Sequence, residues 1–198
     1  MLLGLVGKAG SGKDTVADHL CKEHGFVKRS FAAPLKETLA NLFAMSHEQL
    51  YDQELKEVID ERYGFTPRWL LQHFGTDVCR RLYPHIWVDH LTRTYFAMRD
   101  ALPDVKVVVS DTRFLNEATA IRDAGGYVWR VVCKNNPKEQ KLTGEEQQHA
   151  SEVEQEKIET DIALVASFGA IPLLLQAATD AYRQLQAEHD AVEEVTKP

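Results

Sequence analysis

The sequence has few cysteines, no excess of basic residues and no long apolar run. Cys21, Cys79 and Cys133 lie far apart among 198 residues and form no Cys-x-x-Cys pair. This spacing argues against a disulfide framework or a zinc site and indicates a reducing cytosol, with the cysteines as small buried residues. The formal net charge of −7 argues against a general nucleic-acid binder, because such a surface repels a polyanion.

Apolar stretches that could cross a bilayer are also missing from the sequence. The first apolar run begins directly after Met1, so we expect neither a targeting peptide nor a membrane segment. A cytoplasmic protein is the expectation that follows.

The glycine-rich segment at 7–15, Gly-Lys-Ala-Gly-Ser-Gly-Lys-Asp-Thr, is the most informative feature present. It follows a buried-strand pattern at 2–6 and precedes apolar residues spaced for one helical face. In that context Gly-x-x-x-x-Gly-Lys predicts a loop whose backbone amides and helix N-terminus surround a polyphosphate. Lys13 would bring positive charge to the outer phosphates. The residues assigned to phosphate binding are Gly7, Gly10, Ser11, Gly12, Lys13, Asp14 and Thr15.

The loop departs from the usual pattern directly after Lys13. A hydroxyl residue that holds magnesium usually follows the lysine, whereas here Asp14 comes next and Thr15 one position later. The two side chains point about 100° apart on a helix and cannot occupy the same place. We expect Thr15 to bind phosphate or magnesium. For Asp14 two interpretations stay open: contact with hydrated magnesium or the acceptor, and a favourable negative charge in the first helical turn.

Five segments are predicted as strands, at 2–6, 26–31, 105–110, 127–133 and 162–165, with helical patterns between them. This alternation predicts parallel pairing with right-handed crossovers. About seventy residues separate the second and third strands, and we interpret 34–100 as an inserted helical substrate-binding region. The polar segment 134–148 is either a lid over the phosphates or a plain surface loop. The last helix carries an apolar stripe that predicts core packing, with a dimer surface as the alternative: Ile171, Leu174, Leu175, Ala178, Tyr182 and Leu185.

Polar residues end the third predicted strand. Ligands of doubly wound sheets bind beyond the carboxyl ends of the strands, which predicts Asp111 at the mouth of the site, where its carboxylate can hold hydrated magnesium. Arg113 can hold an acceptor phosphate through its planar guanidinium. A surface aspartate and arginine in a turn are the alternative. We expect Asn116 and Glu117 to cap the following helix.

The 34–100 insertion contains candidates for acceptor binding. Arg68 and Gln72 are four residues apart and share a helical face, and Arg80 lies two turns further if the helix resumes after Gly75. Together they could bind a monophosphate and a base edge, because an amide offers both a donor and an acceptor. Solvated arginines on a polar face are the alternative. Trp87 is predicted in the core.

Taken in order, several segments resemble the deoxynucleoside monophosphate kinases of tailed bacteriophages, relatives of the adenylate kinase group. The segments are 7–15, 30–36, 67–72, 75–80 with 87–89, 111–117 and 149–152. The resemblance implies an α/β fold of three layers, the P-loop kinase fold, with a five-stranded parallel sheet in the order 2-3-1-4-5. Residues 1–198 would form a single kinase domain, with a helical NMP-binding insertion at 34–100 and a lid at 134–148.

The resemblance also implies a reaction, the transfer of the γ-phosphoryl group of ATP to a deoxynucleoside 5′-monophosphate with Mg²⁺. It suggests a homodimer and, for a phage protein, the host cytoplasm. It suggests Lys13 and Thr15 for the ATP phosphates and Asp111 for the metal region. We expect Lys13, Asp14 and Arg113 to take part in catalysis and Thr15 and Asp111 to hold the metal. The dNMP would contact Lys36, Arg68, Gln72, Arg80 and Arg113.

The resemblance leaves some features open. The 134–148 segment contains lysines but no arginine, which leaves the transition-state cation unassigned. His149, Ser151 and Glu152 have no derived role. Two other functions remain as alternatives: a small-molecule kinase of the phosphomevalonate kinase type, and a nucleotide-binding switch without an acceptor. The 67–80 segment favours a nucleotide acceptor, and no Asn-Lys-x-Asp guanine motif supports the switch.

Overall fold

A computed structural model describes residues 1–137 and 150–196 of the chain. The chain divides into two compact units. Unit 1 comprises Met1–Arg29 and Ala101–Pro198, and unit 2 comprises Ser30–Asp100. Among the helices of the described residues, none has both the length and the apolar character that a membrane crossing needs.

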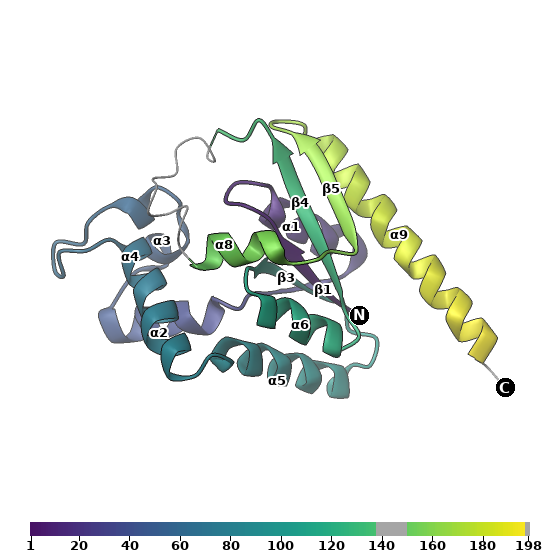
Figure 1. Ribbon diagram of the computed structural model, residues 1–198, viewed down its shortest axis with the longest axis horizontal. Coiled ribbons are helices and arrows are strands. Elements are labelled where there is room, and N and C mark those ends of the chain that lie inside the picture. The colour runs from purple at the N-terminus through teal and green to yellow at the C-terminus, as the bar shows by residue number, and fades with distance from the viewer. Residues whose placement is uncertain (138–149, 197–198) are drawn as a thin grey trace. The chain divides into compact units, whose positions relative to one another are not determined.

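Unit 1 contains a five-stranded parallel sheet (Figure 1). Its strands are β1 (Leu2–Val6), β2 (Val27–Arg29), β3 (Val107–Thr112), β4 (Tyr127–Lys134) and β5 (Ile162–Ser167), and they pair in the order β2-β3-β1-β4-β5. Helices α1 (Lys13–His24) and α9 (Ile171–Thr196) cover one face, and α6 (Leu115–Asp123) and α8 (Ala150–Lys157) lie on the other. The sequence prediction of a three-layer α/β fold with this strand order is confirmed.

The core of unit 1 explains why the central strand is so apolar. Leu3 and Leu5 of β1 are fully buried in a cluster that also contains residues of α1 and α9. On the other face, a Cβ at Gly4 would lie 2.4 Å from Ile121 Cδ1, so only glycine lets α6 approach β1 this closely. Leu174, Ala178, Tyr182 and Leu185 of the apolar α9 stripe are in the core as predicted. Leu175 is only half-buried, and Ile171 is 51% exposed.

The predicted strand bounds require correction. β2 covers 27–29 rather than 26–31, because Phe26 turns into the core, where its ring centroid lies 5.3 Å from that of Tyr182. β3 lies two residues later than predicted, and β4 and β5 extend one and two residues further. The prediction of buried cysteines is also wrong, because all three are free and half-buried.

Unit 2 is helical apart from an isolated antiparallel bridge between Asp60 and Phe65. Its helices are α2 (Ala33–Phe43), α3 (His47–Tyr51), α4 (Pro67–Gln72) and α5 (Ile86–Ala101), with a short 3₁₀ turn, η1 (Leu55–Glu57), and a π-helix, η2 (His73–Arg80). Helix α4 begins where Thr66 Oγ1 accepts a hydrogen bond from the Trp69 amide at 3.1 Å.

The sequence analysis considered a helix that resumes after Gly75, whereas in the structure α4 continues without interruption into η2, which contains Gly75. A Cβ at Gly75 would lie 2.6 Å from Leu35 Cδ2, and the Gly75 carbonyl accepts a hydrogen bond from Trp87 Nε1 at 3.2 Å. Trp87 is therefore in the core, as predicted. Because π-helical hydrogen bonds span five residues, the α-helical phase predicted for Arg80 does not apply.

Candidate functional site

The loop between β1 and α1 closes on itself through Lys13. This side chain is only 7% exposed, and its Nζ donates hydrogen bonds to the carbonyl oxygens of Gly7 and Lys8, the latter at 2.9 Å. A Cβ at Gly7 would lie 2.3 Å from the Val131 carbonyl oxygen, so glycine is required where the loop passes β4. Gly12, at φ 99°, adopts a left-handed conformation at the start of α1. The loop is thus held in a fixed curve.

Ser11 presents an unusual hydroxyl within this loop. The residue is 3% exposed, and within the described parts of the chain its Oγ has no hydrogen-bond partner. Leaving a hydroxyl buried and unpaired costs about 1–3 kcal/mol. A phosphate oxygen in the loop would supply the missing partner.

Asn136 supports the loop from the end of β4. The sequence interpretation placed this residue in a lid, but its side chain is 3% exposed and its Nδ2 donates to the Ala9 carbonyl at 2.8 Å. Asn135, at φ 59°, turns the chain to make this possible. Lys134 is the last residue of β4. The predicted lid from 138 onward lies outside the described residues, as does His149.

The Asp14 carboxylate is held by a lysine that the sequence analysis missed. Lys28 Nζ of β2 lies 2.8 Å from Asp14 Oδ1 and 2.9 Å from Asp18 Oδ1. Burial acts to raise the pKa of Asp14, but the hydrogen bond and charge of Lys28, together with Ser110 and Lys13, lower it below its usual range. Asp14 is therefore ionised at neutral pH. Thr15, in the same helical turn, is exposed.

Asp111 lies within β3 rather than beyond its end, which corrects the sequence prediction. The β1–β3 register passes from Gly4–Val109 to Val6–Thr112, so β3 contains one extra residue. Such a bulge redirects a side chain at the end of a strand. Asp111 is half-buried, while Thr112 is fully buried.

Arg113 follows β3 at the start of α6. Its backbone N–H donates to Glu117 Oε2 at 2.7 Å, and the Phe114 amide donates to the same oxygen at 3.1 Å. Glu117 is 2% exposed. This arrangement confirms the predicted capping role of Glu117 and fixes the backbone that carries the Arg113 guanidinium.

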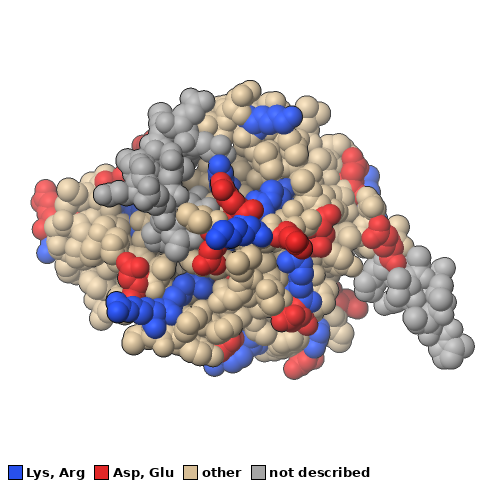
Figure 2. All heavy atoms as spheres, viewed as in Figure 1, with Lys and Arg blue, Asp and Glu red and all other residues tan. Residues whose placement is uncertain are grey.

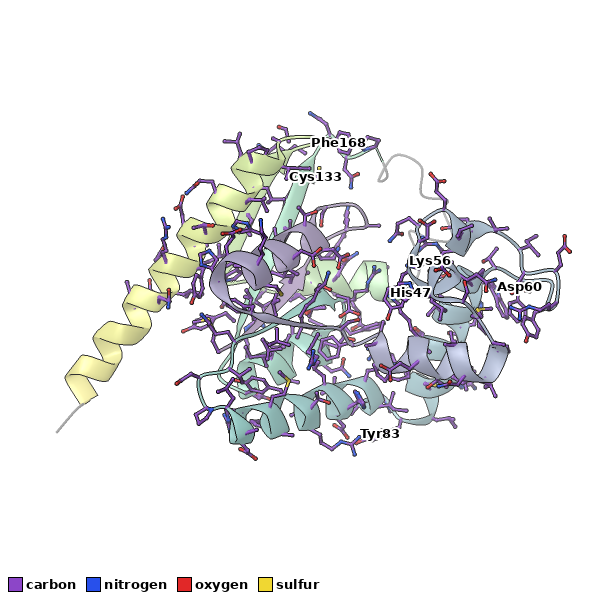
Figure 3. The ribbon with its side chains drawn as sticks, turned by 180° about the vertical axis from the view of Figure 1, so that it is seen from behind. His47, Lys56, Asp60, Tyr83, Cys133 and Phe168 are labelled. Carbon is purple, nitrogen blue, oxygen red and sulfur yellow. The ribbon has the colours of Figure 1, made fainter. Side chains whose placement is uncertain are left out.

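Two other arginines of unit 1 have structural contacts. Arg122 Nη2 donates to the Glu159 carbonyl at 2.5 Å, and Arg130 Nη2 donates to the Ile158 carbonyl at 2.5 Å. Over α6 and α8, basic and acidic side chains are interspersed rather than grouped by sign (Figure 2). The carboxyl ends of β4 and β5 share one edge of the sheet, marked in Figure 3 by Cys133 and Phe168.

The two arginines of α4 and η2 that are predicted to bind the acceptor already have partners within unit 2. Arg68 Nε donates to Glu57, and Arg68 Nη2 lies 3.5 Å from Gln53 Oε1. Gln72, the last residue of α4, is half-buried. Arg80 Nη1 donates to the Pro84 carbonyl at 3.4 Å. Both guanidinium groups would have to exchange these contacts to bind a phosphate.

Lys36 lies in an aromatic environment. Its Nζ is 3.8 Å from the centroid of the Tyr51 ring, which stacks on His47 at 4.3 Å. In the same unit, Asp60 accepts hydrogen bonds from Arg62 and Gln49, and Arg62 holds the pKa of that carboxyl well below its usual range. Figure 3 labels His47 and Asp60. The Asp60 network serves the 60–65 turn.

Unit 2 also contains an open cavity of about 440 Å³. Its lining residues are Tyr83, Ile86, Asp89, Thr92 and Arg93. The Tyr83 hydroxyl donates to Asp89 Oδ2 at 2.6 Å, and this contact raises the pKa of Tyr83. The volume is in the range of small-molecule sites, and the lining offers an aromatic ring, a carboxylate and a guanidinium.

Comparison with solved structures identifies the fold. The chain is similar to dephospho-CoA kinase from Campylobacter jejuni, with a TM-score of 0.53 and 12% identity over 95% of this chain and 98% of that one. It is also similar to TT1252 from Thermus thermophilus, with a TM-score of 0.51 and 16% identity over 95% and 97% of the two chains. At these identities the likeness establishes the kinase fold alone.

Comparison of sequences goes further. A curated protein of Acanthamoeba polyphaga mimivirus, named "Putative deoxynucleotide monophosphate kinase", is 39% identical over 176 residues, which cover 83% of this chain and 88% of that protein. The family model for deoxynucleotide monophosphate kinase matches residues 49–166. That match covers more than half of the chain and contains Arg68, Gln72, Arg80 and the β3–α6 turn. The chain therefore belongs to the deoxynucleotide monophosphate kinase family.

Proposed function

We propose that this enzyme transfers the γ-phosphoryl group of ATP in line to a deoxynucleoside 5′-monophosphate, producing ADP and the deoxynucleoside diphosphate. The observation that carries the proposal is the self-closed loop at 7–15, with a buried Lys13, in a chain of this kinase family. Phosphoryl transfer depends mainly on alignment and charge neutralisation, which such a loop supplies.

The donor triphosphate is proposed to bind at Gly7, Gly10, Ser11, Gly12, Lys13, Asp14 and Thr15. Backbone amides would surround the phosphates, and the unpaired Ser11 hydroxyl would donate to an oxygen. Lys13 Nζ would leave the carbonyl oxygens of Gly7 and Lys8 and move to the outer phosphates. Asn136 would keep the loop in register during this exchange.

Magnesium is proposed to bind with ATP rather than in an all-protein site. Mg²⁺ usually takes one or two protein oxygens and completes its shell with phosphate and water. The Thr15 hydroxyl and the Asp111 carboxylate fit that donor chemistry. When bound, the ion would neutralise charge on the transferring phosphate.

The acceptor is proposed to contact Lys36, Arg68, Gln72 and Arg80 of the 34–100 insertion, with Arg113 at its phosphate. Arginine suits this role because its planar fork matches phosphate oxygens. Gln72 would read a base edge through its amide.

A panel of acceptors tests the proposal. ADP formation would be followed with dTMP, dGMP, dCMP, dAMP, their ribo counterparts and phosphomevalonate. We expect strong stimulation by at least one deoxynucleotide and none by phosphomevalonate. Stimulation by phosphomevalonate alone would favour the other kinase class, and ATP hydrolysis that no acceptor accelerates would favour a nucleotide switch. Repeating the assay with EDTA tests the proposed magnesium requirement.

A further inference from the structure

A charge network links three elements of unit 1 beside the phosphate-binding loop. Lys28 of β2 contacts both Asp14 and Asp18, at 2.8 and 2.9 Å. The two aspartates are four residues apart and therefore lie on one face of α1. Ser110 of β3, on the neighbouring strand, also acts to lower the pKa of Asp14. Lys28 therefore ties β2 to the first turns of α1 through both carboxylates.

Exposure distinguishes the members of this network. The Lys28 side chain is 33% exposed, whereas the side chains of Asp14 and Asp18 are 72% and 68% exposed. Asp18 alone would be enough to pair the lysine charge. The second contact goes to Asp14, which directly follows Lys13 and is itself among the residues proposed to lie at the ATP phosphates. A carboxylate without a cationic partner at that position would repel the phosphates.

We propose that Lys28 is a positioning residue that fixes the Asp14 carboxylate and balances its charge at the mouth of the phosphate-binding loop. The inference rests on the proposed binding of ATP at 7–15. Without Lys28, Asp14 would keep its negative charge, lose its partner and turn toward the nucleotide. ATP would then bind more weakly because the unpaired Asp14 carboxylate repels its phosphates. Lys28 would thus act through Asp14, without contacting ATP itself.

The test is a double-mutant cycle on ATP affinity, measured by calorimetry with Mg²⁺ and no acceptor. The variants are Lys28→Met, Asp14→Asn and the two combined, with Asp18→Asn as the matched control because it removes the other partner of the same lysine. We expect Lys28→Met to raise the Kd for ATP about tenfold, within the range of couplings between contacting groups. The same substitution should change the Kd less than about twofold in the Asp14→Asn background, because the carboxylate through which Lys28 acts is then absent. Non-additivity of this kind is expected of groups in contact.

Three outcomes would overturn the inference: an undiminished effect of Lys28→Met in the Asp14→Asn background, no effect at all, or an equal effect of Asp18→Asn. A purely structural role would lower the Tm of both Lys28→Met proteins but would leave the two ATP effects additive. Should Lys28→Met fail to fold, Lys28→Gln takes its place in the cycle. Higher salt should shrink the Lys28→Met effect, because ions screen the unpaired carboxylate.

The cycle also separates this inference from the proposed reaction. Calorimetry requires ATP and Mg²⁺ but no acceptor, so a protein that shows the coupling yet phosphorylates no acceptor would support the role of Lys28 and reject the proposed function. Phosphorylation of a deoxynucleotide without the coupling would support the proposed function and reject the role of Lys28. A wild-type protein that binds no ATP would reject both.

Discussion

Replacing Lys13 by methionine separates catalysis from folding. Methionine keeps the length of the side chain but removes the ammonium that donates to the Gly7 and Lys8 carbonyl oxygens. Each such hydrogen bond from a charged donor contributes about 1.5–3 kcal/mol. The lysine is only 7% exposed, and removing its charge also relieves a desolvation penalty of several kcal/mol. The two terms oppose each other, so we expect little change in the free energy of unfolding.

Catalysis should respond very differently. A cation that stabilises the transferring phosphoryl group contributes about 10³–10⁵ in rate, which is roughly 4–7 kcal/mol of transition-state stabilisation. Turnover by Lys13→Met in the coupled ADP assay should fall by that factor, with an unfolding midpoint close to that of the wild type. Turnover within about tenfold of the wild type would refute the assigned role, since tenfold is only about 1.4 kcal/mol.

Lys8 offers the matched control from the same loop. Its Nζ lies 3.3 Å from Glu156 Oε1, and its side chain is 44% exposed. Exposed ion pairs contribute about 0–1 kcal/mol, so Lys8→Met should fold normally and keep most of its activity. Equal losses in the two variants would mean that general positive charge, rather than the Lys13 ammonium, supports the reaction.

Further predictions concern the loop, the pH dependence and the acceptor. Gly7→Ala would place a Cβ 2.3 Å from the Val131 carbonyl oxygen and should destabilise the fold by about 1–3 kcal/mol in urea unfolding; no loss would contradict the close approach. Burial, followed by the charge of His19, lowers the pKa of His24 below its usual value of about 6.5. The neutral His24 side chain therefore contributes its full stability to the fold above about pH 6.5, and this contribution is lost as the pH falls through the lowered pKa. Between pH 7.5 and 5.5 the wild type should therefore lose more stability than His24→Gln, and equal losses would exclude this linkage. Gln72→Ala should raise the KM for the acceptor about tenfold without changing the KM for ATP, because it removes one hydrogen bond that contributes about 1–1.5 kcal/mol. A shift in the KM for ATP instead would place Gln72 on the donor side.

Local patterns in the sequence were enough to predict the alternation of strands and helices and the glycine-rich turn at 7–15. The buried strand at 2–6, the glycines and the helix after Lys13 are neighbours in the chain, and their spacing constrains the backbone directly. The capping role of Glu117 is similarly local, because it depends on residues three and four positions away. Strand order, by contrast, came from the family resemblance rather than from any pattern in the residues.

Residues that support the site through long-range contacts could not be found in this way. In the sequence, Asn136 looks like part of a polar loop. Its amide gains a structural role only because the end of β4 lies beside the loop at Ala9, 127 positions earlier, where Asn136 donates a hydrogen bond. Lys28 reads as one of several lysines, and its two partners become apparent only when β2 lies against α1. A buried polar group can be expected to find a partner, but the sequence does not say which one.

The position of Asp111 shows the same limit within a single strand. The valine run at 107–109 predicted the strand, and the first polar residues were interpreted as its end. Hydrogen bonding to β1 nevertheless continues to Thr112, and the extra residue in β3 is accommodated by a bulge. A one-residue slip turns a side chain to the opposite face of a sheet, so the bulge decides where the carboxylate points. The bulge depends on pairing with a strand about a hundred residues earlier in the chain. The polar character of Asp111 could therefore mark it as a candidate site residue but could not predict where its side chain points.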